Sequence, residues 1–572
     1  MKFVKSICLA LFVMLCLGMV GLSASAEDTA QGNGTHIGSH DALYVGSVKV
    51  TPENQDDILG DGTASYDPST TTLTLRNYTS TKGIMQEYTI PSGETIKNYF
   101  SVYGGGNTNW TVRVEGKCTF YGGIVLERGE VIIEDARVTF EDNVAVCVDV
   151  NQGRFIVLDS KVKVKGISGL NPVQMSRYMT CAFYAYTMRM EDSTISCTPA
   201  HPKSDYRDYF LYAYDSASFI NCHLVVDTPF PLFSATFASF AGGLNFLDCE
   251  IDLKGQEICF VALGEDNDLL GQVSEEAGFI VFDKSRIDIS SSSYGIRCTD
   301  LAFENSLMEG KFYYDAIAIM GASVEDRFII KNARLELSRH TFSYMKRHMW
   351  KPYWEALSER DQTEYGSYDD FLTMIHENKY GSQSAISHGI YVLDGALFLD
   401  NSNINIKGYQ FGVFLSGQSA LQLRERCVIR LSAEKAAFMV VSSYPSPMEE
   451  QATYKANAPI AKAELPESAI DSLGTHVITF TEKGKSLTLN GTYTSDNQNT
   501  SHLYLMSQGL DGTATSLVMR TEGATMMWLY VVLTLAVLLL VVLILYFVII
   551  RRQKLVSAET DDDTTPSEDG KK

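Results

Sequence analysis

The stretch Asp135-Ala136-Arg137-Val138-Thr139-Phe140 is the first copy of a pattern that recurs along the chain and decides its fold. An Asp or Asn is followed by a small residue, after which apolar residues occupy every second position. The next copy reads Asp159-Ser160-Lys161-Val162-Lys163-Val164. A period of two is typical of a β-strand that has one buried face. Each copy therefore predicts a turn followed by a strand.

The openers of the copies set the length of the repeat. They are Asp135, Asp159, Asp192, Asn221, Asp248, Asn305, Asn332 and Asn401, with Lys284 and Arg426 opening two looser copies. Successive openers are 21 to 36 residues apart, except for one gap of 69 residues. Such a repeat indicates a solenoid, because no single copy can bury its own apolar face. We therefore expect an all-β chain in which residues 116–440 form a parallel β-helix of about ten coils.

The recurring Asp and Asn residues have two interpretations. They suit a ladder of side chains that satisfies backbone groups at a turn, and we prefer this structural role to a cluster of catalytic carboxylates. Cys222, Cys249 and Cys427 occupy the small-residue column and should be buried fillers. The sequence contains no CxxC motif and no His/Cys pair at ligand spacing, so we expect neither a metal site nor a cofactor.

An apolar segment lies near each end of the chain. Residues 1–26 have a charged start, an apolar stretch and a small-residue cleavage site, which predicts a secretion signal. Residues 526–550 carry no charge and suit a transmembrane helix in contact with the lipid bilayer. Arg551 and Arg552 follow directly, which favours a cytoplasmic tail over 551–572. The sequence thus predicts a single-pass cell-membrane protein with an extracellular N-terminal ectodomain.

Residues 27–115 differ from the repeats and predict a small β-rich module or cap. It contains Leu43-Tyr44-Val45-Gly46, Gly60-Asp61-Gly62, Tyr66-Asp67-Pro68 and Leu73-Thr74-Leu75. The Asp67-Pro68 turn between alternating segments predicts a hairpin. This combination resembles the N-terminal block of surface proteins from gut Gram-positive bacteria, described as carbohydrate-binding or pectate-lyase-like. The resemblance implies a right-handed parallel β-helix displayed at the cell surface.

The 69-residue gap predicts a helical insertion over residues 340–386. Residues 344–360 look helical, with a kink or restart at Pro352. Ser367 followed by Asp370 is a capping pattern that should open a helix over 371–379.

The insertion carries the residues that we select as candidate ligand contacts. Trp350, Tyr353, Trp354, Arg347 and His348 would form an aromatic, partly basic patch that stacks sugar rings or grips a peptide. In the alternative interpretation, Trp350, Trp354, Leu357 and Phe371 pack the helices onto the solenoid, because their spacing suits one helix face.

Residues 441–525 predict a linker and a small juxtamembrane β element. Residues 476–480 and 485–489 alternate like the two strands of a hairpin. Such an element could close the open end of the solenoid, whose exposed strand edge would otherwise favour aggregation.

Charge limits the partners. The net charge of −22 disfavours nucleic acid and suits neutral glycans or host surface molecules. Glycan binding or adhesion through a flank of the solenoid is our leading interpretation. The alternatives are a membrane-tethered polysaccharide lyase or glycoside hydrolase, and a structural spacer. Asp227, Asp252, Asp288, Arg347 and His348 have suitable chemistry for catalysis but form no local motif, so the sequence assigns no catalytic residue and favours a protein that is not an enzyme.

Overall fold

The computed structural model describes about two thirds of the chain. The described residues are 41–80, 84–89, 95–141, 145–149, 151–165, 179–198, 207–227, 233–240, 242–262, 278–320, 327–356, 362–363, 365–373, 387–393, 395–416, 420–423, 426–441, 463–466, 478–482, 485–489, 500–503, 516–520 and 525–559. The predicted secretion signal, most of residues 441–525 and the end of the predicted tail lie outside them.

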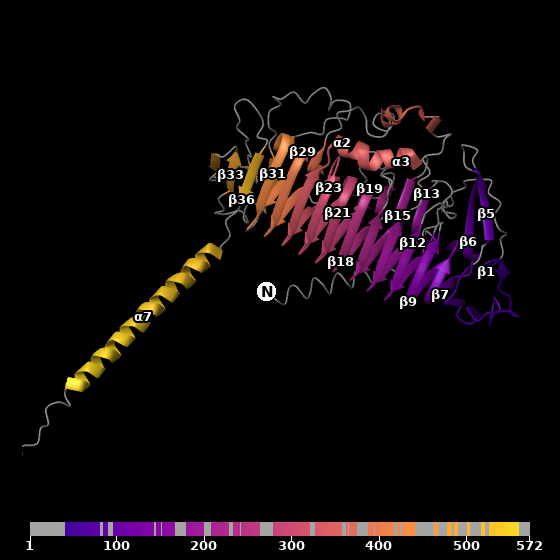
Figure 1. The fold of residues 1–572 in the computed structure, drawn as a ribbon, viewed down its shortest axis with the longest axis horizontal. Helices are drawn as coiled ribbons and strands as arrows, with labels where there is room; N and C mark the ends of the chain where they lie inside the picture. The colour runs from indigo at the N-terminus through magenta and orange to yellow at the C-terminus, as the bar shows by residue number, and fades with distance from the viewer. Residues whose placement is uncertain are drawn as a thin grey trace, which may run out of the picture. The chain divides into compact units, whose positions relative to one another are not determined.

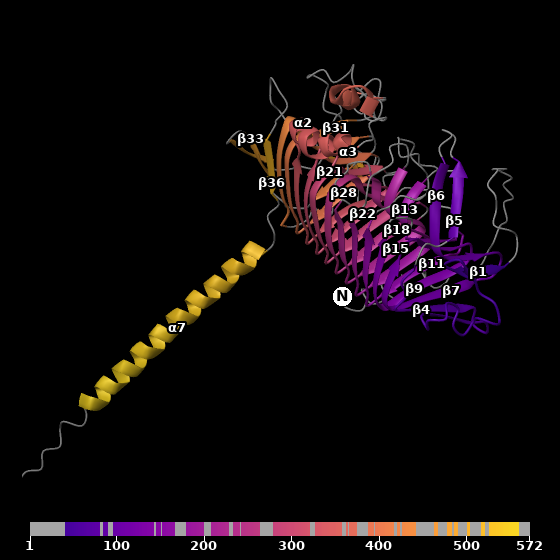
Figure 2. The same cartoon turned by 45° about the vertical axis from the view of Figure 1, so that its right-hand side comes forward.

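Strands dominate the described chain, and 32 of them belong to one large mixed sheet. β11 (Arg154–Leu158) pairs in parallel with β9 (Gly129–Glu141) on one side and with β13 (Met179–Glu191) on the other. From β7 (Trp110–Phe120) to β31 (Val428–Val441), parallel partners are two or three strands apart in the chain. The strands follow one another in chain order in both views (Figures 1 and 2). The expected all-β class is confirmed.

The other strands of this sheet have the following bounds: β1 (Ala42–Val45), β2 (Val48–Lys49), β3 (Ala64–Asp67), β4 (Thr72–Arg76), β5 (Ile84–Thr89), β6 (Thr95–Gly105), β8 (Gly123–Leu126), β10 (Val146–Val148), β12 (Lys161–Lys165), β14 (Thr194–Thr198), β15 (Arg207–Ile220), β16 (His223–Asp227), β17 (Phe233–Ser239), β18 (Gly243–Leu247), β19 (Glu250–Ala262), β20 (Phe279–Asp283), β21 (Arg286–Cys298), β22 (Asp300–Glu304), β23 (Leu307–Phe312), β24 (Ile317–Met320), β25 (Arg327–Lys331), β26 (Arg334–Arg339), β27 (His388–Leu393), β28 (Ala396–Asp400), β29 (Asn403–Ser416), β30 (Ala420–Leu423) and β36 (Ser516–Arg520).

The first described strands, β1 to β6, belong to the same sheet. β3 and β4 form the predicted antiparallel hairpin, and Asp67 Oδ1 accepts a hydrogen bond from Ser69 N at 2.9 Å in its turn. β4 then pairs in parallel with β7, which pairs in parallel with β9. Residue 115, where we expected a boundary, lies inside β7. The sheet is therefore continuous from the N-terminal hairpin into the repeats.

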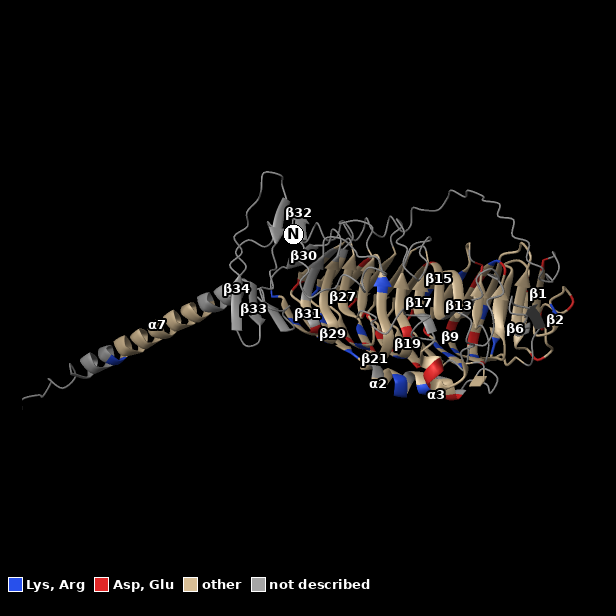
Figure 3. Ribbon diagram, turned by 90° about the horizontal axis from the view of Figure 1, so that it is seen from above, with Lys and Arg blue, Asp and Glu red and all other residues tan. Residues whose placement is uncertain are grey.

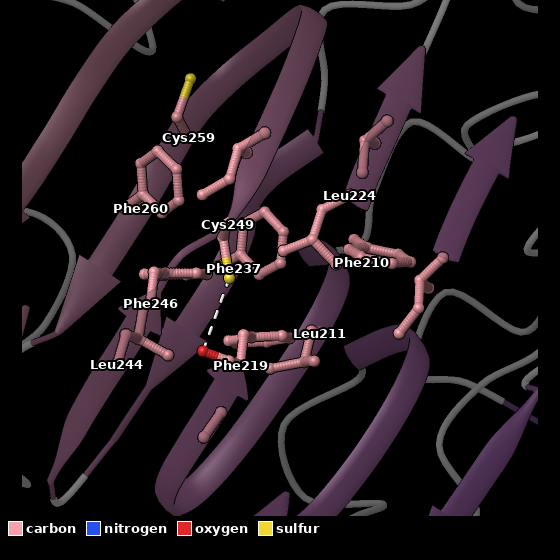
Figure 4. Close-up of a cluster of buried hydrophobic side chains, with 14 of the residues drawn as sticks. Phe210, Leu211, Phe219, Leu224, Phe237, Leu244, Phe246, Cys249, Cys259 and Phe260 are labelled. Carbon is pink, nitrogen blue, oxygen red and sulfur yellow. Dashed lines mark hydrogen bonds between the residues drawn. The ribbon is translucent and has the colours of Figure 1, made fainter. Parts of the chain in front are cut away.

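Aromatic rings stack through the interior of the repeats. The centroid of Phe246 lies 4.7 Å from that of Phe219 and 4.9 Å from that of Phe282, and Phe303 continues the stack 4.8 Å beyond Phe282. These distances equal the usual separation of neighbouring strands, because each ring occupies the same position in successive repeats. Figure 4 shows Phe219 and Phe246 among the buried side chains. Each stacked pair adds about 0.5–1.5 kcal/mol to the hydrophobic stabilisation.

Nine cysteines lie in the described chain, and all are buried and outside any disulfide bond. Cys222, Cys249 and Cys427 occupy the small-residue column, as predicted, and are at most 3% exposed. The Sγ atom of Cys249 lies 3.5 Å from the carbonyl oxygen of Phe219 (Figure 4). The sheet is thus built without disulfides in this part of the chain.

The insertion begins with α2 (Phe342–Met345), the π-helical turn η2 (Lys346–Trp350) and α3 (Lys351–Ala356). The π-turn lies directly before Pro352, where an α-helix would bring the proline ring against the carbonyl four residues earlier. The predicted cap is present, because Ser367 Oγ donates to Asp370 Oδ2 at 2.6 Å and Asp370 N donates to Ser367 Oγ at 3.1 Å. Residues 368–373 are helical, and the rest of the helix predicted over 371–379 lies outside the described residues.

The C-terminal part contains further strands and one long helix. β33 (Ile478–Glu482) and β34 (Lys485–Leu489) form the predicted hairpin, β32 (Ala463–Pro466) pairs with β35 (Thr500–Leu503), and β36 pairs antiparallel with β31. In α7 (Thr525–Glu559), residues Val532–Arg551 have a mean hydropathy of 3.3 and are long enough to cross a membrane. This is the one candidate span among the described residues, near the C-terminus as expected.

Candidate functional site

The ten openers share an uncommon backbone conformation. All have φ between 45° and 57°, in the left-handed region. Asn and Asp tolerate this region better than other residues that carry a Cβ, which explains why they recur at this position. Lys284 and Arg426 adopt the same conformation without that advantage. The openers therefore form one column of left-handed turn residues, which we call the turn column.

Several side chains of the turn column are hydrogen-bonded to one another. Asn401 Nδ2 donates to Asn332 Oδ1 at 2.8 Å, Asn332 Nδ2 donates to Asn305 Oδ1 at 3.1 Å, and Asn305 Nδ2 donates to Asp283 Oδ1 at 2.8 Å. The amides thus form a chain of hydrogen bonds with one direction across successive repeats.

Where the residue after an opener is Ser, its hydroxyl satisfies the buried backbone. Ser306 Oγ accepts from Ser285 N at 3.0 Å and donates to the carbonyl oxygen of Glu304 at 2.7 Å. Ser402 Oγ likewise accepts from Ala333 N at 3.3 Å and donates to the carbonyl oxygen of Asp400 at 2.7 Å. The sequence assigns a similar backbone role to the Asp and Asn side chains of the turn column, and that assignment stays a prediction. At these two turns the serine hydroxyls, which point inward, make the bonds to the backbone, and the Asn amides bond to one another.

A groove with a cavity volume of about 550 Å³ runs over five consecutive repeats. One wall is the turn column, and the other consists of residues two positions later. The backbone of the small residues between them forms the floor. The lining residues are Lys284, Ser285, Arg286, Asn305, Ser306, Leu307, Asn332, Ala333, Arg334, Asn401, Ser402, Asn403, Arg426 and Val428. The side chains of these small residues are buried and point into the interior, so they do not fill the space between the two walls, which we call the turn-column groove.

Four lining residues are basic and none is acidic. Arg334 Nε lies 3.1 Å from Glu336 Oε1, and Lys284 Nζ lies 3.9 Å from Asp248 Oδ2. Within the described chain, no ion pair is recorded for Arg286 or Arg426. Basic and acidic residues are interspersed along the strands as a whole (Figure 3), so a lining that is only basic distinguishes the groove.

The insertion residues that we predicted as ligand contacts divide into two groups. Trp350 is 2% exposed and is buried with Met345, Phe371 and Leu372. Trp354 is half-buried, and its ring centroid lies 5.3 Å from that of Phe371. This arrangement is the one that the packing interpretation expects. Arg347 and His348 are exposed on the same helical segment, and the side chain of Tyr353 lies outside the described part of the structure.

A stack of three rings, buried at its His340 end, runs along the start of the insertion. The centroids of Tyr344 and His340 are 4.1 Å apart, and those of Tyr344 and His348 are 4.6 Å apart. Burial lowers the pKa of His340, which is 8% exposed. Tyr368 donates a hydrogen bond to the carbonyl oxygen of Lys346, and burial raises its pKa to about 12. The rings therefore hold the first helical turns of the insertion together.

The carboxylates that we considered for catalysis lie on neighbouring strands. Asp252 and Asp288 are direct partners in the register of β19 and β21. His223 Nε2 lies 3.2 Å from Asp252 Oδ2, and Asp227 pairs with Lys254 at 3.3 Å. Arg347 and His348 belong to the insertion instead. Among the described residues, no group of three or more His, Cys, Asp or Glu side chains is arranged to hold a metal ion.

No family model, curated protein or solved structure matches this chain. The turn-column groove was not among the sequence-based candidates. Its signal was nevertheless present, because Lys284 and Arg426 depart from the Asp or Asn expected at openers.

Proposed function

We propose that this chain is a membrane-anchored cell-surface protein that binds glycans along one flank of a right-handed parallel β-helix. The parallel pairing of strands two or three positions apart supports the β-helix. We assign a right-handed winding because connections between parallel strands of one sheet are almost always right-handed. The predicted secretion signal and the arginines after the apolar helix support an extracellular N-terminal region.

The observation that carries the binding function is the turn-column groove. Amide and guanidinium groups line it at intervals set by the strand spacing, over five repeats. A surface with a regular repeat suits a ligand with a regular repeat, such as a linear glycan. The many hydroxyl and ring oxygens of such a chain can accept hydrogen bonds from these donors.

The groove favours binding over hydrolysis by paired carboxylates. Its lining contains no Asp, Glu or His, which are the usual general acids and bases, in the described part of the chain. Trp350 is buried, so the groove, together with exposed residues of the insertion such as Arg347, is the better candidate for ligand contact. We keep the spacer as the alternative if no ligand binds.

The experiment uses the full-length protein in detergent micelles on an array of acidic and neutral glycans, with mass spectrometry of the glycans after incubation. Binding without shorter products is the expected result. Shortened products would identify an enzyme, and failure to bind any glycan would overturn the proposal and favour a spacer. A C-terminal epitope that antibodies reach only after the cells are permeabilised would support the proposed orientation.

A further inference from the structure

We infer that the turn-column groove binds an acidic glycan whose negative charges lie on alternate sugars. This inference rests on the proposed glycan-binding function and specifies its ligand. It follows from the spacing of the basic residues, from the hydrogen-bonding groups between them and from the carboxylates outside the groove.

The basic residues recur at every second repeat. Lys284 and Arg286 belong to the first of the five repeats, Arg334 to the third and Arg426 to the fifth. The strand pairing gives the order of the residues along the second wall. Leu307 is paired with Arg286 on one side and with Arg334 on the other, so one repeat separates the two arginines. Two strand spacings amount to about 10 Å. A sugar unit in an extended chain is about as long as one strand spacing, so these charges match an acid group on every second sugar.

The Asn side chains of the groove offer mainly hydrogen-bond donors. Asn305 Oδ1 and Asn332 Oδ1 already accept hydrogen bonds from the next amide of the turn column. Asn403 Oδ1 accepts from Arg430 Nη1 at 2.9 Å. Each amide nitrogen carries two hydrogens, and the bond along the column uses only one of them. The groove therefore suits a ligand rich in acceptors, as carboxylated and N-acetylated sugars are.

Carboxylates outside the groove limit the charge density of the ligand. Asp283 and Asp400 directly precede openers, and Asp288 and Glu309 lie two residues beyond the second wall, yet none of them lines the groove. They would repel a chain with an acid on every sugar more strongly than one with half that density. The combination favours an alternating polymer over a uniformly charged one.

The test compares three probes on the full-length protein in detergent micelles: hyaluronan, with an acid on alternate sugars; polygalacturonate, with an acid on every sugar; and a neutral N-acetylglucosamine oligomer. Arg334→Ala removes the central charge. Lys284→Asn and Arg426→Asn each remove one charge from an outer repeat and introduce the residue that the turn column prefers, so these two variants should fold. Arg137→Ala is the matched control, because Arg137 is exposed at the same position of a repeat outside the groove.

We expect hyaluronan to bind most tightly and to lose about tenfold or more in affinity with Arg334→Ala, as for a charge-assisted hydrogen bond. Each Asn variant should also weaken binding, and Arg137→Ala should not. Tighter binding of polygalacturonate, or hyaluronan binding that none of the three groove variants weakens, would overturn the inference. Binding of the neutral oligomer alone would overturn it while leaving the proposed function intact. Failure of all three probes would overturn the inference, whereas the proposed function fails only if the wider glycan array is also negative.

Discussion

The left-handed turn column leads to a sharp prediction about Asn332, which has a φ of 49°. Replacing it with Gly or Val removes the same two hydrogen bonds, to Asn305 and from Asn401, which together cost about 1 kcal/mol at this exposed site. Gly lowers the free energy of unfolding by about 0.5 kcal/mol more, because it gains conformational entropy in the unfolded chain. Val lowers the free energy of unfolding by about 2 kcal/mol more, because a β-branched residue fits the left-handed region poorly. Asn332→Val should thus be the less stable variant by about 1.5 kcal/mol.

Asn405 provides the matched control. It lies in the regular strand β29, and its side chain donates to Glu336 Oε2 at 2.6 Å. Val is favoured over Gly in strands by up to about 1 kcal/mol, so the order should reverse and Asn405→Gly should be the less stable variant. Thermal unfolding of the four full-length variants, followed by circular dichroism, measures the order of their midpoints. If Val is tolerated as well as Gly at position 332, the turn conformation does not select Asn and the reasoning fails.

Three further predictions concern the interior. Ser306→Ala should lower the free energy of unfolding by about 1–3 kcal/mol, measured by urea denaturation, because it leaves the buried N–H of Ser285 without its acceptor; an unchanged midpoint would contradict this role. Phe246→Ala should cost about 3–5 kcal/mol in the same assay, since Phe246 lies inside the ring stack; a loss below about 1 kcal/mol would mean that the stack contributes little. At pH 8 a thiol-reactive dye should label none of the nine cysteines of the described region in the folded protein, and all nine after denaturation. The thiols are buried, and burial raises the pKa of Cys259 to about 12. Rapid labelling of these cysteines in the folded protein would contradict this.

Much of the fold could be predicted because its signals are local. Alternation identifies strands such as Lys161–Lys165, where the buried face is read directly from every second residue. The cap formed by Ser367 and Asp370 and the hairpin around Asp67 also depend only on residues a few positions apart.

Other features depend on residues far apart in the chain. The groove exists because Arg286, Leu307 and Arg334 are neighbours across strands, and no short window of sequence contains them together. The burial of Trp350 depends on a cluster that includes Phe371 and, at its edge, Tyr313, which directly follows β23. Helical spacing alone shows that Trp350 and Trp354 share a face, but it does not show what that face contacts.

The hydrogen bond between Asn401 and Asn332 joins residues 69 positions apart, yet it is as short as its neighbours in the turn column. The repeat thus resumes in register after the insertion. The pairing of the strands is the same whether the chain between two repeats is short or long. Doubling the length of such a loop costs only about 0.6 kcal/mol in closure entropy. The insertion is therefore a natural grafting point, where a protein engineer could exchange the native helices for a foreign peptide and display it on a rigid scaffold.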